Sequence, residues 1–115
     1  MTTSSAFGTI LDCTRKLDKA VLDRDTEQYS KLYDALSAME TASLSSSQCR
    51  EILDADRSLL LPFELGYELY RRLVSDAPTK ENYSRFAFWL RFFGPDHDKE
   101  ADDLDQVAQL LFGDN

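Results

Sequence analysis

The sequence is poor in the residues that favour strands and turns. Its 115 residues include only three Val and two Ile, together with four Gly and three Pro. Apolar residues recur at intervals of three and four, the period of a helix, and not at the interval of two that is typical of a half-buried strand. The sequence therefore predicts an all-α fold.

Cysteine and long apolar runs are also scarce. Cys13 and Cys49 lie far apart and lack the spacing of a metal or redox motif, so we expect two packed, reduced thiols. The longest apolar stretch, residues 59–70, is interrupted by Glu64 and Glu68 and is shorter than the roughly 18 residues that span a bilayer. The first residues also lack the basic segment of a secretory signal, so we expect a cytoplasmic protein without a membrane partner.

Basic residues are also few compared with acidic ones. The chain has 13 basic and 21 acidic residues, a net charge of −8, and its last 22 residues alone carry one basic and seven acidic groups. Because a negative field repels phosphate, we expect no nucleic-acid partner, whereas a basic protein would be attracted. The length suits a single domain over residues 1–115, with flexible ends at 1–5 and 113–115.

Six helices are expected, separated by short breaks. Pro62 suits a first helical turn, Pro78 and Pro95 mark helix ends, and Gly94 suits the position after a helix. Short connections predict antiparallel neighbours, arranged as stacked hairpins or as a compact bundle. The expected helices cover about residues 5–22, 26–39, 46–56, 62–75, 80–93 and 97–112.

Small and aromatic residues recur at fixed spacing in the second half of the chain. They are Gly66, Tyr70, Leu73, Pro78, Tyr83, Phe86, Ala87, Leu90 and Ala101. Over residues 63–112 this pattern resembles the tetratricopeptide repeat family. The resemblance implies stacked helical hairpins and a concave groove that binds a peptide or a helix of another protein.

The expected helix 80–93 carries rings on more than one side. At about 100° per residue, Phe86, Leu90 and Phe93 fall on the side of Tyr83, which we take as the core face. Three other rings lie outside this core face, next to a basic residue. They are Phe88, Phe92 and Trp89, beside Arg85.

Those rings allow two interpretations. They are packed by another helix of the same chain, or they form an exposed anchor patch, because aromatic and Arg side chains concentrate at interface hot spots. The second interpretation predicts that Arg85, Phe88, Trp89 and Phe92 bind a partner.

The last expected helix is acidic. Asp102, Asp103 and Asp105 lie too deep in it to be explained by the dipole at its start, so they form a solvated face or a surface for a basic partner. The same helix is expected to turn Ala101, Leu104 and Leu111 inward, together with Val107 or Ala108. Its carboxylates lack the Gly and Glu positions of a calcium loop, so we expect no metal.

Catalytic and cofactor motifs are lacking. His97 is the only histidine and stands in a polar turn, and no phosphate-binding glycine motif occurs. We therefore expect no enzyme, no cofactor and no small-molecule substrate.

Two functions remain open from the sequence. The first is a non-catalytic interaction module or adaptor, which binds another protein or itself, as a homodimer, through helix 80–93. The second is an acidic inhibitor, similar to an antitoxin or immunity protein, which covers a basic site through helix 97–112 with Asp102, Asp103 and Asp105.

Overall fold

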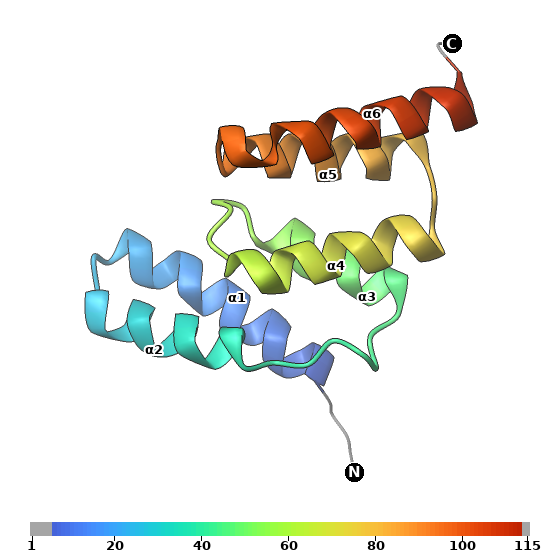
Figure 1. Ribbon diagram of the computed structural model, residues 1–115. Coiled ribbons are helices and arrows are strands. Elements are labelled where there is room, and N and C mark those ends of the chain that lie inside the picture. The colour runs from blue at the N-terminus through green and yellow to red at the C-terminus, as the bar shows by residue number, and fades with distance from the viewer. Residues whose placement is uncertain (1–5, 114–115) are drawn as a thin grey trace. The chain divides into compact units, whose positions relative to one another are not determined.

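The computed structural model describes residues 6–113, which form six α-helices and one short 3₁₀ helix (Figure 1). The all-α prediction is confirmed, and the described residues contain no strand. In chain order the elements are α1 (Ala6–Leu22), α2 (Thr26–Ser37), α3 (Ser46–Ala55), α4 (Phe63–Asp76), α5 (Lys80–Phe92), η1 (Pro95–His97) and α6 (Asp98–Phe112). The predicted flexible ends, apart from Gly113, and the predicted helix start at Ser5 lie outside the described residues.

The contacts divide the chain into two compact units, Met1–Tyr70 and Arg71–Asn115, and the boundary falls inside α4. Nothing in these contacts tests the expectation of a single domain, and the choice between stacked hairpins and a closed bundle stays open.

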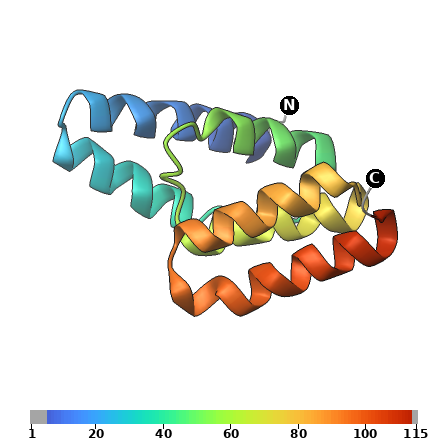
Figure 2. The same ribbon diagram turned by 90° about the horizontal axis from the view of Figure 1, so that it is seen from above.

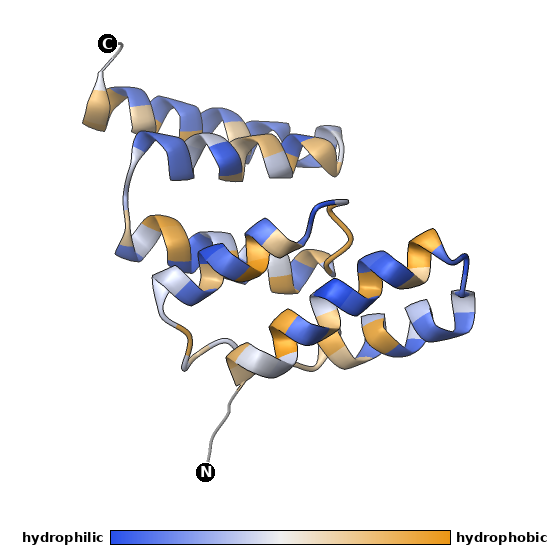
Figure 3. Cartoon of the chain, turned by 180° about the vertical axis from the view of Figure 1, so that it is seen from behind, coloured by the Kyte–Doolittle hydropathy of each residue, from blue (hydrophilic) through white to orange (hydrophobic). Residues whose placement is uncertain are grey.

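The first unit is built on the hairpin of α1 and α2. These two helices lie side by side, and α3 packs against α1 (Figures 1 and 2). Along each helix, apolar and polar residues alternate with the helical period, so one side is available for packing (Figure 3). The core of this unit contains large aliphatic side chains, among them Ile10, Leu17, Leu36, Ile52 and Leu61.

Side-chain caps define the helix starts in this unit. The Asp25 carboxylate accepts a hydrogen bond from the Gln28 N–H at the start of α2. Ser45 and Gln48 form a capping box at the start of α3, in which each side chain accepts a hydrogen bond from the backbone N–H of the other. These bonds satisfy N–H groups that have no partner within the helix.

The connection from α3 to α4 is organised by a buried carboxylate. Asp56 accepts hydrogen bonds from the N–H groups of Leu60, at 2.7 Å, and Leu61, at 3.3 Å. Burial is the main cause that raises the pKa of Asp56 above its ordinary value, while these two bonds act in the opposite direction. Leu59 adopts a positive φ of 56°, a strained conformation for a residue with a side chain.

The second unit is built on the antiparallel hairpin of α5 and α6, which run side by side (Figures 1 and 2). Thr79 caps α5 by accepting a hydrogen bond from the Asn82 N–H, and the Asn82 amide donates to the Ala77 carbonyl. Gly94 follows the helix with φ 119° and ψ 178°, a conformation that favours glycine. Pro95 then begins η1, which leads into α6.

Candidate functional site

The exposed face of α5 carries two aromatic rings. The side chains of Phe88 and Phe92 are 65% and 55% exposed, although both are large and apolar. They stand four residues apart, so they lie on one side of the helix. The ring of Phe92 also meets that of Phe93 edge-on, with centroids 5.5 Å apart, which limits the positions that it can adopt.

Trp89 does not belong to this exposed face. Its side chain is only 1% exposed, so the prediction that it forms part of an exposed anchor patch is wrong. Its ring lies edge-on to that of Phe93, 4.7 Å away, and at a tilt to that of Phe86, 6.4 Å away. Since Trp89 is buried as fully as Phe86 and Leu90, the buried part of α5 is wider than one stripe.

Arg85 and Arg91 differ in their surroundings. Arg85, the basic residue predicted to flank the patch, is half-buried. Arg91 is exposed and donates two hydrogen bonds from the same nitrogen, each 2.7 Å long, to Asp102 and Asp105 of α6. These bonds, with Asp102 as the largest cause, raise the pKa of Arg91.

The three predicted acidic residues are exposed, and each forms an ion pair. Asp102 and Asp105 pair with Arg91, and Asp103 pairs with Lys99 at 3.2 Å on the same helix. Two positive charges therefore neutralise part of the acidic surface of α6. A basic partner would have to compete with these internal pairs.

The C-terminal end of α6 is a second exposed apolar site that sequence reasoning missed. Leu111 was expected to face inward but is 59% exposed, and Leu110 is 85% exposed. The ring of Phe112 tilts against that of Tyr83 near the start of α5, 6.1 Å away. The available signal was the run of three apolar residues, because consecutive positions on a helix cannot all face one core.

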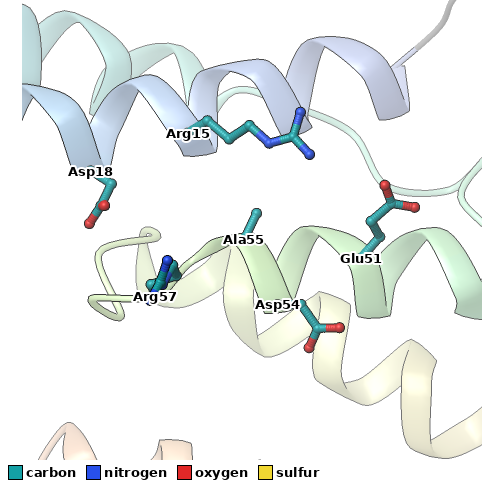
Figure 4. Close-up of a pocket in the computed structure, with 6 residues that line it drawn as sticks. All are labelled: Arg15, Asp18, Glu51, Asp54, Ala55 and Arg57. Atoms are coloured by element: carbon teal, nitrogen blue, oxygen red, sulfur yellow. The ribbon is translucent and has the colours of Figure 1, made fainter.

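A charged hollow of about 410 Å³ lies between α1 and α3 in the first unit (Figure 4). In Figure 4, Arg15 from α1 and Glu51 from α3 extend into the space between the helices. The lining combines three acidic with two basic side chains, so it favours neither anions nor cations strongly. The residues that line it are Arg15, Asp18, Glu51, Asp54, Ala55 and Arg57.

The described residues show little that resembles a metal or redox centre. They include no group of three or more His, Cys, Asp and Glu side chains that is placed to hold a metal ion. Cys13 is half-buried and Cys49 is buried, and both are free thiols. His97 is half-buried in η1.

Of the helices in residues 6–113, none is both long and apolar enough to cross a membrane.

No family model, no curated protein and no solved structure matches this chain. The resemblance to tetratricopeptide repeats therefore stays a prediction.

Proposed function

We propose that this protein is a small non-catalytic α-helical interaction module, which binds a segment of another protein or a second copy of itself through Phe88 and Phe92. One observation carries the proposal: both rings are more than half exposed on a helix whose other rings are packed. Exposed aromatic side chains on a rigid element are the usual anchors of protein interfaces.

The packing beneath these rings supports an anchor role. Trp89 is buried next to Phe93, and Phe93 contacts the ring of Phe92, so Phe92 is held against an ordered core. A side chain that is ordered before binding loses less conformational entropy when a partner covers it. Phe92 therefore has the preorganisation that an interface hot spot needs.

The size of the surface indicates what the partner must supply. Two phenylalanines exposed to this degree present on the order of 200 Å² of apolar surface, whereas a stable interface buries about 800 Å² on each partner. The rings would therefore act as the centre of a larger contact.

The alternative function is the acidic inhibitor that covers a basic site through α6. The ion pairs of Asp102, Asp103 and Asp105 give it less support than the exposed rings give the interaction module. We expect the module to act in the cytoplasm, which agrees with two free thiols.

Replacing both rings tests the proposal. Phe88→Ser with Phe92→Ser should abolish partner capture from the native host, or self-association measured by light scattering after size exclusion. Helicity, measured by circular dichroism, should stay unchanged. The matched control is Leu22→Ser, which removes a 77% exposed apolar side chain from the other unit and should leave binding intact.

Two results would contradict the proposal. If the double variant captures the same proteins as the wild type and has the same mass in solution, these rings are not an anchor. If the double variant loses its helicity, the rings are part of the core.

A further inference from the structure

Three adjoining hollows lie on the first unit, along α2 and the start of α4. The central one, of about 280 Å³, is lined by Tyr33 and Phe63. It shares Tyr33 with a hollow of about 400 Å³ towards Tyr29, and it shares Ser37 and Glu64 with one of about 220 Å³ on the other side. Because neighbouring hollows share lining residues, they adjoin one another, and we call the three together the aromatic groove.

Three aromatic rings line this groove, and each is stacked on a neighbouring ring. Tyr29 and Tyr33 are stacked on α2, with ring centroids 6.0 Å apart and an angle of 29° between the rings. Phe63 is stacked in the same manner on Tyr67 of α4, at 5.7 Å and 26°. Stacking restrains these rings, so the groove presents aromatic faces in fixed positions. Such faces attract cations.

The charged side chains along the groove are all acidic. Asp34, Glu64 and Glu68 line it, and none of the described residues that line it is basic. Asp34 and Glu64 are exposed and make no ion pair with another described residue. Their charge is therefore available to a ligand.

We propose that the aromatic groove binds a basic, extended segment of another protein, with an arginine side chain held between the rings of Tyr33 and Phe63 and the carboxylate of Glu64. The observation behind this choice of ligand is the combination of aromatic faces with acids and without basic residues. A guanidinium group stacks on aromatic rings and pairs with carboxylates, whereas an apolar or acidic segment would leave the acids without a partner.

The size of the hollows agrees with a peptide. Pockets that enclose a whole small molecule usually measure about 300–1,000 Å³ and are mostly apolar. Here three adjoining open hollows, of about 220, 280 and 400 Å³, can each take one side chain of an extended segment. This site is separate from Phe88 and Phe92, so it does not rest on the function proposed above.

A defined peptide tests the inference. The probe is a hexapeptide with blocked ends that consists of three arginine–proline repeats, added to the ¹⁵N-labelled protein. It should shift the amide signals of residues 29–37 and 63–68 and reach saturation, and salt should weaken its binding. A matched peptide with citrulline in place of arginine keeps the shape, removes the charge and should not bind.

Single substitutions in the aromatic groove should weaken the arginine peptide. Glu64→Gln and Tyr33→Ala should each lower its affinity by about two- to fivefold, whereas Tyr33→Phe keeps the ring and the affinity. The control Asp76→Asn removes one exposed negative charge outside the groove and should leave the affinity unchanged. Thermal melts establish that each variant is folded.

Several outcomes would overturn the inference. They are equal binding of the citrulline peptide, signal shifts confined to residues 98–112, an effect of Asp76→Asn as large as that of Glu64→Gln, and no binding up to millimolar peptide.

Discussion

The two units differ in the apolar surface that they expose. Six of the nine large, exposed apolar side chains among the described residues belong to the second unit, and only Val21, Leu22 and Tyr33 belong to the first. The first unit instead buries a carboxylate, Asp56, and presents acids beside aromatic rings in the aromatic groove. The two halves therefore offer different chemistry to a partner: mainly apolar contact on one, and recognition of positive charge on the other.

The largest effect is expected at the boundary between exposed and buried rings in the second unit. Trp89→Ala should lower the free energy of unfolding by about 3–5 kcal/mol, because it removes a buried ring that packs on Phe93 and Phe86. Phe88→Ala should change it by only about 0.5 kcal/mol. Urea denaturation of both variants measures the contrast, and equal losses would show that Phe88 is buried like Trp89.

In the first unit, the largest polar effect is expected at Asp56. Asp56→Ala should cost about 1–3 kcal/mol at neutral pH, because the N–H groups of Leu60 and Leu61 lose their acceptors. The same urea denaturation measures the loss. Asp54→Ala, at an exposed carboxylate on α3, is the control and should cost much less. A loss no larger than that of the control would show that Asp56 does not organise the connection.

The buried carboxylate should also make stability depend on pH. Because burial raises the pKa of Asp56 in the folded state, the folded state holds this proton more tightly than the unfolded state. The stabilisation that comes from this tighter protonation is therefore complete below the ordinary pKa of 3.8 and is lost as pH rises through the folded pKa. Denaturation at several pH values should show wild type losing stability relative to Asp56→Asn over that window, and a constant difference would contradict the prediction.

Helix caps allow a direct comparison of the two units. Ser45→Ala in the first unit and Thr79→Ala in the second should each cost about 1 kcal/mol, because each leaves one helix N–H without its acceptor. The control is Ser47→Ala, which stands in the first turn of α3 without a capping role. If only one cap matters in thermal unfolding, the two units do not unfold as one cooperative system.

The smallest effect is expected for the ion pairs between α5 and α6. Arg91→Gln removes both contacts with Asp102 and Asp105 but should cost only up to about 1 kcal/mol, because all three side chains are exposed. Repeating the denaturation at high salt should reduce the difference between variant and wild type. A larger loss that salt does not change would show that these pairs are shielded from solvent.

Local signals in the sequence predicted most helix ends. Pro62, Gly94 and Pro95 act through the backbone of their immediate neighbours, and the structure places helix boundaries at each of them. The helical period also placed Phe86 and Leu90 correctly in the core. Capping and periodicity need no knowledge of distant residues, which is why a sequence is sufficient for them.

Features that join distant residues could not be predicted. Arg91 meets carboxylates 11 and 14 positions later, and the aromatic groove combines residues of α2 with residues at the start of α4. A helical wheel assigns one core face, so it placed Trp89 on a flank, whereas α5 buries a wider arc that includes this ring. Which side of a helix is covered depends on its neighbours and not on its own period.

The turn at Gly94 has a consequence for the order of folding. It joins α5 and α6 through the few residues from Phe93 to His97, so the chain closes only a short loop when these helices meet. The entropy lost in closing a loop grows with its length, and contacts between neighbours in sequence form fastest. We therefore expect this hairpin to be among the first tertiary structure to form. Phe88 and Phe92 would then be fixed on the exposed side of α5 early in folding.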